Sequence, residues 1–383
     1  MIIYSKTGRR WSNDYEFNIV AALDQVDFTS NNVTYYHHPY DNLFHGINFI
    51  EAVDLIHFEH IKNNPTVTLV HENSSEAIDA RFAEEVFCVI STHKINPQQI
   101  KIIAADENHK NFLRTYLENK GITGVQIAVN NHLLSKVNEI PDSVEEQIIT
   151  TNKFSSLSRN YKDWRLFLYQ ALFTNDLLKH FKYSFHNIWP YSNENITFSI
   201  DQMTDDLKKL GVSSFSNGFM KWLNRCPHDI VGLELENNVK NKWSNVTYDA
   251  ILSADFHLMI ETHFDQRAFT GQLTFNRSHG PSSITEKAYK AIACARPFIT
   301  FATPYFLEDI QNLGYKTFSP FINEDYDIEL DNTKRLNMIV AEVSRICNLP
   351  DSEYSELVKN CRNIAKFNKQ HFENQKKNFK YDD

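Results

Sequence analysis

The sequence has 383 residues, of which 42% are hydrophobic, and this length predicts two domains that can each bury a core. Its 28 Phe and 17 Tyr against 10 Gly exclude a glycine-rich repeat and a disordered chain. The formal net charge of −9 excludes a large basic field for duplex DNA, although a local basic patch is compatible with it.

Residues 1–145 alternate short apolar runs with helical patterns, and we expect them to form the first domain. Strands that alternate with helices of this length predict parallel βαβ units. The expected strands are Ile2–Ser5, Val33–His37, Leu55–Phe58, Val67–Val70, Val86–Ile90, Ile102–Ala105 and Val125–Val129, and the expected helices are Asp14–Asp24, Ser75–Glu85 and Asn108–Lys120.

A connector over residues 136–154 contains the turn residues Ile140-Pro141-Asp142-Ser143 and leads into a second α/β series. We expect a second domain over 154–350 and a C-terminal helix within 351–383. The expected strands are Phe154–Leu157, Tyr183–His186, Ile230–Leu235, His257–Glu261, Phe298–Phe301 and Thr317–Pro320, and the expected helices are Trp164–Leu172, Met203–Leu210, Thr285–Ala295, Pro304–Leu313, 332–347 and 351–377.

Two successive α/β series predict two Rossmann-like domains that face a central cleft. Nucleotide ligands bind at the carboxyl ends of the strands in open α/β folds, although the fold alone names no reaction. The sequence contains neither Gly-x-Gly-x-x-Gly nor a P-loop, which disfavours a dehydrogenase or a kinase.

The sequence also indicates the setting of the protein. It has no run of 18 apolar residues, so we expect no transmembrane helix. The N-terminus is typical of a first strand and not of a signal peptide. Five widely spaced cysteines without a CxxC pair predict reduced thiols in a cytoplasmic protein: Cys88, Cys226, Cys294, Cys347 and Cys361.

The most informative segment begins at Ser283 and has the pattern of a loop, a helix and a buried strand. A helix N-terminus attracts an anion such as a diphosphate, and Lys287 adds a cation that the helix dipole alone would disfavour. Glu286 is placed to accept hydrogen bonds from both ribose hydroxyls. Alternatively, Ser283-x-x-Glu286 fits a capping box, which needs no ligand.

The stretch Ser283-Ile-Thr-Glu-Lys-Ala-Tyr-Lys-Ala-Ile-Ala-Cys-Ala-Arg-Pro-Phe-Ile resembles the donor motif of the α1,3-fucosyltransferases. It is also similar to a family of phage and microbial glycosyltransferase-like proteins with an S-E-K-T…P-F-I motif. Leu313-Gly-Tyr-Lys-Thr-Phe318, the strand ending at Glu261, and the segment from Ser155 to Arg165 extend this resemblance over roughly 154–330. The resemblance implies a GT-B-type glycosyltransferase whose C-terminal half binds the donor.

The resemblance also implies roles for single residues. Glu286 would bind the ribose, Lys287 the diphosphate, and Arg159 or Arg165 would assist. The remaining donor-binding candidates are Ser283, Thr285 and Glu261. The chain departs from the family pattern in two places, because Arg296 replaces the usual Gly before Pro297 and Ala288 replaces a Thr.

The general base is expected in the first domain, at the end of a central strand. Glu72 follows the apolar run Val67–Val70, and Asp106 follows Ile102–Ala105. A carboxylate there could deprotonate an acceptor hydroxyl if burial raises its pKa. Either residue could instead be the N-cap of the following helix, and this is the more natural role for Asp106.

Two other patterns are compatible with a metal. Asp325-Tyr326-Asp327 is an Asp-x-Asp, but its acidic surroundings predict a solvated turn. The pairs His37-His38 and His57-Phe-Glu-His60 lack metalloprotease spacing, so we interpret them as strand-end histidines. We expect no metal and no cofactor, with the nucleotide sugar as co-substrate.

We therefore expect a glycosyltransferase that moves a sugar from a nucleoside diphosphate sugar to a hydroxyl. The acceptor would be a glycan, or a hydroxylated base in phage DNA approached through Lys6, Arg9 and Arg10. The alternative is a non-catalytic nucleotide-sugar-binding or scaffold protein that keeps the fold.

Overall fold

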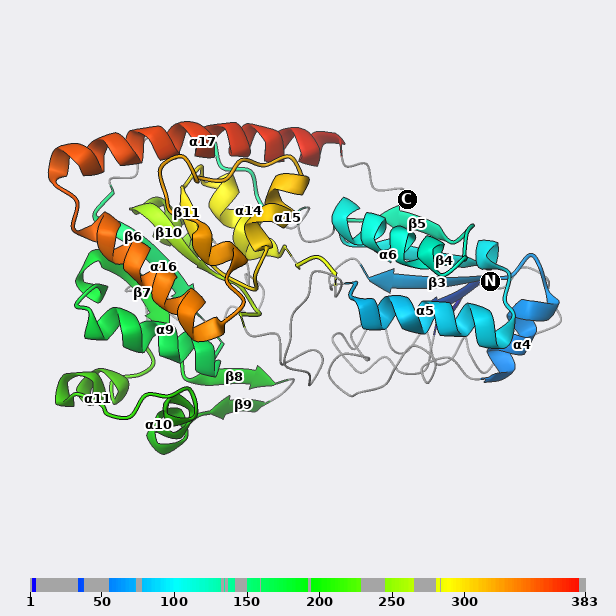
Figure 1. The fold of residues 1–383 in the computed structure, drawn as a ribbon, viewed down its shortest axis with the longest axis horizontal. Coiled ribbons are helices and arrows are strands. Elements are labelled where there is room, and N and C mark those ends of the chain that lie inside the picture. The colour runs from blue at the N-terminus through cyan, green and yellow to red at the C-terminus, as the bar shows by residue number, and fades with distance from the viewer. Residues whose placement is uncertain are drawn as a thin grey trace. The chain divides into compact units, whose positions relative to one another are not determined.

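The computed structural model describes residues 2–4, 34–37, 55–73, 78–131, 134, 137–141, 150–158, 160–191, 194–228, 245–264, 280–282 and 284–378. The chain divides into two compact units. The first comprises Met1–Lys136, Gly271–Ser283 and Tyr381–Asp383, and the second Val137–Thr270 and Ile284–Lys380. Each unit is built on a parallel sheet with helices (Figure 1), which confirms the expected α/β class with two Rossmann-like domains.

The sheet of the first unit has five described strands, and each pairs in parallel with the next one in the chain. The strand order therefore shows no reversal among the described strands. The strands are β1 (Ile2–Tyr4), β2 (Thr34–His37), β3 (Thr68–Asn73), β4 (Ile100–Ala104) and β5 (Gln126–Val129), and the helices are α4 (Leu55–Asn63), α5 (Ala80–His93), the 3-10 turn η1 (Pro97–Gln99) and α6 (Glu107–Asn119).

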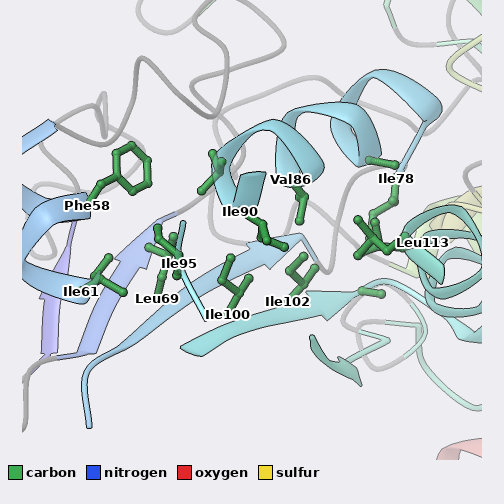
Figure 2. Packing of buried hydrophobic residues seen from close by; sticks show 14 of the residues in the cluster. Phe58, Ile61, Leu69, Ile78, Val86, Ile90, Ile95, Ile100, Ile102 and Leu113 are labelled. Carbon is green, nitrogen blue, oxygen red and sulfur yellow. The ribbon is translucent and has the colours of Figure 1, made fainter. Parts of the chain in front are cut away.

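Apolar side chains from the sheet and its helices form the core of the first unit (Figure 2). Leu69, Ile100 and Ile102 come from the strands, and Val86 and Ile90 come from α5; none is more than 4% exposed. The alternation of buried residues along β4 shows that one face of this strand is covered. The strand predictions Ile2–Ser5, Val33–His37, Val67–Val70, Ile102–Ala105 and Val125–Val129 are confirmed, with small shifts at the ends.

Two other strand predictions in this unit are wrong. Leu55–Phe58 begins helix α4, and Val86–Ile90 lies inside helix α5. Val86, Val89 and Ile90 follow the i, i+3, i+4 spacing of a buried helical face, so their β-branched side chains were a misleading signal. Asp79 starts α5 by accepting a hydrogen bond from the Phe82 amide at 2.9 Å.

Residues 280–282 belong to the first unit although they follow much of the second in the sequence. Gly280 has a φ of +116°, and a Cβ at this position would lie 2.8 Å from the main-chain oxygen of Ile78. Only glycine allows this conformation and this close approach of two backbone segments. The return of this segment to the first unit has no local signal in the sequence and was not predicted.

The sheet of the second unit has the order β11-β10-β6-β7, and all of its strand pairs are parallel. The chain adds β7 on one side of β6 and then returns to add β10 and β11 on the other. The four strands are β6 (Asn152–Ser158), β7 (Phe181–Phe185), β10 (Ala254–Ile260) and β11 (Phe298–Phe301), and a separate hairpin comprises β8 (Ile188–Tyr191) and β9 (Glu194–Thr197).

The helices of this unit match most of the expected ones, including both long C-terminal helices (Figure 1). The short helices α11 and α12, the turn η2 and the β8–β9 hairpin were not foreseen. The helices and 3-10 turns are α9 (Asp163–Thr174), η2 (Leu178–His180), α10 (Ile200–Lys209), α11 (Asn217–Leu223), α12 (Asn245–Leu252), α14 (Glu286–Ala293), α15 (Phe306–Asn312), η5 (Asp325–Ile328), α16 (Asn332–Cys347) and α17 (Asp351–Asn378).

The strand prediction Thr317–Pro320 is wrong, because this segment forms turns. The amide of Phe318 donates to the carboxylate of Glu324 at 2.8 Å, a side-chain contact that replaces a strand partner. The expected helix Asp14–Asp24 and strand Ile230–Leu235 lie outside the described residues, as do Lys6, Arg9 and Arg10.

All five cysteines are free thiols, in agreement with the expected reduced state. None of the helices in the described part of the chain combines the length and the apolar character that a membrane span requires.

Candidate functional site

The strand order of the second unit marks one point of its sheet as a ligand site. The order reverses between β6 and β10, which are neighbours although β7 comes between them in the sequence. Ligands of open α/β sheets bind outside the carboxyl ends of the strands at such a reversal. The residues at this point are Ser158, the last residue of β6, and Glu261, the residue after β10.

Helix α14 begins at the same end of the sheet, and Thr285 is its N-cap. The Thr285 hydroxyl donates to Glu261 Oε2 at 2.7 Å and accepts a long hydrogen bond from the Lys287 amide at 3.4 Å. Glu286 is therefore the first helical residue and not the third. The capping-box interpretation of Ser283-x-x-Glu286 is wrong, since the position that it gave to Ser283 belongs to Thr285.

The ammonium group of Lys287 lies among four side-chain oxygens, which we call the oxygen ring. It donates to Thr285 Oγ1 at 3.0 Å and to Thr262 Oγ1 at 3.1 Å. The carboxylate oxygens Glu286 Oε1 and Glu261 Oε2 lie 3.4 and 3.7 Å from the same nitrogen. The predicted donor residues Glu261, Thr285, Glu286 and Lys287 therefore meet at one place.

Glu261 is the most deeply buried acid of this group, with 3% of its surface exposed. Its Oε1 atom is buried and has no hydrogen-bond partner in the described part of the chain. Burial raises the pKa of Glu261, although the Lys287 ammonium opposes the shift. For Glu286, burial also raises the pKa, but Lys287 and Lys290 outweigh it, so the net shift is downward and its charged form is favoured.

Arg165 connects helix α9 to the end of β10. Its guanidinium donates to the main-chain oxygens of Asn160 at 2.9 Å and Glu261 at 3.0 Å, while its Nε has no partner among the described residues. The buried hydroxyl of Ser158 also has no partner there. Unpaired buried polar atoms are rare in folded proteins. Three of them, on Ser158, Arg165 and Glu261, lie near the carboxyl ends of β6 and β10, and they indicate a place for a polar ligand.

Two further groups were not predicted from the sequence. Lys162 precedes α9 and donates from Nζ to the main-chain oxygen of Thr262 at 2.8 Å, and His263 follows Thr262 in the chain. Burial lowers the pKa of Lys162 to about 8, and Arg165 and Lys287 add to the shift. Lys162 carries the same sequence signal as Lys287, a cation at the start of a helix, and this signal could have identified it.

The site therefore concentrates positive charge. Lys162, Arg165 and Lys287 carry three cations; the carboxylates near them are Glu286, Glu261, whose charged form burial disfavours, and Asp163, beside Lys162 in the chain. Burial, together with the same three cations, lowers the pKa of His263 to about 3, so its imidazole is neutral at physiological pH. A concentration of cations at a helix N-terminus suits an anionic ligand.

Some predicted site residues lie elsewhere or outside the described part. Arg159 and Ser283 are among the residues outside it. Asp106, in the first unit, is the N-cap of α6 and is paired with the ring of His109 at 2.8 Å, which is the capping alternative left open by the sequence. Glu72 lies within β3, where it is in register with Ile103 of β4.

The Asp-x-Asp motif has a structural role at one of its residues. The carboxylate of Asp327 accepts hydrogen bonds from the amides of Leu307 at 3.0 Å and Glu308 at 3.4 Å, at the start of α15. Asp327 is buried while Asp325 is exposed, so the prediction of a solvated turn is wrong for Asp327. His57 and His60 lie in helix α4, so the strand-end interpretation of this pair is also wrong.

The departure from the family pattern at Arg296 has a clear structural basis. Its guanidinium is buried and donates from Nε to the main-chain oxygen of Ala254 and from Nη2 to that of Leu252, both at 3.0 Å. Ala295 takes the positive φ of +46° that a glycine would accept more easily. The arginine therefore ties the end of α14 to the start of β10.

No model of a known protein family matches this sequence, and no curated protein matches it. Among solved structures, the chain is similar to an α,α-trehalose-phosphate synthase (UDP-forming) from Burkholderia vietnamiensis, with 10% identity over 96% of this chain and 79% of that one, and a TM-score of 0.41. It is similar to the GtfA/B complex, with 10% identity over 95% and 60% of the two chains and a TM-score of 0.42. An α,α-trehalose 6-phosphate synthase from Burkholderia multivorans gives 9% identity over 96% and 76%, with a TM-score of 0.42.

Proposed function

We propose that the second unit binds a nucleoside diphosphate sugar and that the protein transfers the sugar to a hydroxyl acceptor. The observation that carries this proposal is the cluster of Lys162, Arg165 and Lys287 beside the N-terminus of α14, at the reversal of the strand order. A diphosphate brings the negative charge that this cluster lacks.

In this proposal each residue has a distinct task. Lys287 and the main-chain N–H groups of the first turn of α14 bind the diphosphate, and Lys162 lies close enough to add a second ammonium. Glu286 stays ionised and accepts hydrogen bonds from the ribose hydroxyls. Arg165 acts as a positioning residue, because both of its hydrogen bonds go to main-chain oxygens.

Transfer would break the bond between the anomeric carbon and the diphosphate oxygen and form a bond from that carbon to the acceptor oxygen. The departing diphosphate takes the bonding electrons, and the fixed cations stabilise the charge that develops on it. The acceptor proton passes to a carboxylate. Of the two candidates, Glu72 and Asp106, we propose Glu72, because Asp106 caps α6 and its pairing with His109 lowers its pKa. Metal is not needed to neutralise the leaving group in this scheme, so transfer is expected to continue in EDTA.

The acceptor is proposed only as a hydroxyl, either of a glycan or of a hydroxylated base in DNA. Incubation with a radiolabelled nucleotide sugar separates the two, with one arm containing oligosaccharides and the other containing DNA with hydroxymethylated bases. Label on neither acceptor, together with tight binding and no slow hydrolysis of the sugar, would support the alternative of a non-catalytic binding protein.

Calorimetry of the purified protein with UDP, GDP and dTDP tests the donor site. We expect Glu286→Ala and Lys287→Ala each to abolish measurable binding while the far-UV circular dichroism spectrum stays unchanged. Lys334→Ala is the matched control, because Lys334 also lies in the first turn of a helix of the same unit but pairs with Glu329, which is not part of the oxygen ring. Unchanged affinity in both site variants would show that the donor site is elsewhere.

A further inference from the structure

Lys287 is not an unpaired cation in a preformed anion site, because its ammonium already has partners in the protein. Its side chain is 28% exposed, and its ammonium lies within the oxygen ring of Glu261, Thr262, Thr285 and Glu286. A ligand phosphate must compete with these oxygens for the same three N–H donors. The ring therefore resembles an occupied anion site whose anion belongs to the protein.

We propose that Glu261 is an internal competitor of the anionic ligand. Its carboxylate holds Lys287 in the oxygen ring, and the ligand binds when the lysine turns from Glu261 to the phosphate. This inference rests on the proposed function, since it concerns the regulation of the same site.

The two carboxylates of the ring are not equivalent. Glu286 is the more exposed of the two, with 17% of its side chain accessible against 3% for Glu261. Glu261 is also fixed by the Thr285 hydroxyl at 2.7 Å and by the Thr262 amide at 3.2 Å. It cannot follow the lysine outward, so a shift of Lys287 toward a ligand lengthens the contact to Glu261 first.

Loss of this contact changes the ionisation of Glu261. Burial raises the pKa of Glu261, and Lys287 is the largest influence that opposes the rise. When the ammonium turns to the phosphate, the carboxylate loses that support and takes up a proton from solvent. Nucleotide binding would therefore be accompanied by proton uptake, and affinity would fall as the pH rises.

Other charged groups around Glu261 limit the size of this effect. Arg165 of α9 lies against its main-chain oxygen and interacts favourably with the charged carboxylate, and Glu286 of α14 disfavours that charge. Lys162, before α9, binds the neighbouring Thr262 oxygen, and His263 is neutral. None of these contacts is broken by the proposed turn of Lys287, so the change at Glu261 should dominate.

The test is calorimetry with UDP, GDP and dTDP at pH 6 and pH 8.5, in two buffers with different ionisation enthalpies. Glu261→Gln keeps the shape but removes the competing charge, so we expect about tenfold tighter binding at pH 8.5, and no proton uptake. Thr262→Val removes one oxygen of the ring and should tighten binding by a smaller factor while proton uptake persists. Glu342→Gln, which removes another buried carboxylate that pairs with Arg345, is the control and should leave affinity unchanged.

The outcomes separate this inference from the proposed function. Weaker binding by Glu261→Gln would show that the carboxylate contacts the ligand directly, and unchanged proton uptake would show that another group titrates; either result overturns the inference alone. If Glu261→Gln does not fold, Thr262→Val decides, because binding no tighter than in the wild type contradicts the competition. Absence of binding to the wild type overturns the proposed function as well.

Discussion

Arg165 donates a hydrogen bond from Nη2 to the main-chain oxygen of Glu261 at 3.0 Å. This bond joins the first turn of α9 to the residue that follows β10, so the position of the buried carboxylate depends on a helix from another part of the sequence. Burial lowers the pKa of Arg165 to about 10, and the nearby Glu261 carboxylate opposes the shift. The guanidinium thus stays charged at physiological pH.

Arg165→Lys is expected to weaken both stability and nucleotide binding. A lysine has no planar fork, so it cannot bind the main-chain oxygens of Asn160 and Glu261 together. The loss of a hydrogen bond to a charged group predicts a decrease of about 1.5 to 3 kcal/mol in the free energy of unfolding. Urea denaturation measures this free energy of unfolding. Arg114→Lys, at an exposed position, is the control and should leave the free energy unchanged. Equal stability of the two variants would contradict the role of Arg165.

The N-cap of α14 gives a second prediction. Thr285→Val removes the hydroxyl that accepts from the Lys287 amide and donates to Glu261, so the free energy of unfolding should fall by about 1 kcal/mol or more. Thr285→Ser keeps the hydroxyl and should retain most of the stability of the wild type. Ser283→Ala should change stability by no more than about 0.5 kcal/mol, whereas a capping box would make that change costly. Thermal denaturation of the three variants tests the role of Thr285 as the N-cap.

Asp327 predicts a pH-dependent contribution to stability. Burial raises the pKa of Asp327 to about 7, from an ordinary value of 3.8. Between these values the folded protein binds a proton that the unfolded chain does not, so this group stabilises the fold increasingly as the pH falls from 8 to 5. The free energy of unfolding of Asp327→Asn relative to that of the wild type should therefore be highest at pH 8, and this difference should disappear at pH 5. Urea denaturation at four pH values measures the difference, and a difference independent of pH would contradict the assignment.

The two candidate bases, Asp106 and Glu72, should differ in what is lost when each is changed to its amide. Asp106 is buried, caps α6 and pairs with His109 at 2.8 Å, so Asp106→Asn should lower the free energy of unfolding by about 3 kcal/mol or more. Burial raises the pKa of Asp106, but His109 outweighs it and the net shift is downward. Its contribution is therefore present above the unfolded pKa and is lost as acid protonates the folded carboxylate.

Glu72→Gln is expected to affect transfer instead. A general base contributes about 10²- to 10⁴-fold, so transfer should fall by this factor while donor affinity stays near that of the wild type. Single-turnover assays and calorimetry measure the two quantities. Transfer at the parent rate in both amide variants would place the base at another acidic residue.

Most of the fold could be predicted because apolar runs and helical periods alternate clearly in this sequence. The errors occur where one pattern suits two structures. Val86–Ile90 is rich in β-branched residues, yet its buried positions have helical spacing. Thr317 and Phe318 are residue types that favour strands, but the Phe318 amide donates to the carboxylate of Glu324, which lies outside the expected strand.

The candidate site could be predicted only in part. Glu286 and Lys287 are neighbours in the motif, so their common position was evident, and Glu261 followed from the end of a recognisable strand. Lys162 is far from this motif in the sequence, and only the pairing of β6 with β10 brings it to Thr262. Strand order depends on which chain segments cross over the sheet, and local patterns carry little information about that.

The return of residues 280–282 to the first unit has a consequence for protein engineering. A fragment that ends near residue 136 would leave the main chain of Ile78 without the close approach of Gly280, and the ring of Phe112 near it would lose a neighbour. A single cleavage between the two halves therefore does not yield the complete first unit. Separate production of that unit would require residues 280–282 to be rejoined through a linker, as in a circularly permuted chain.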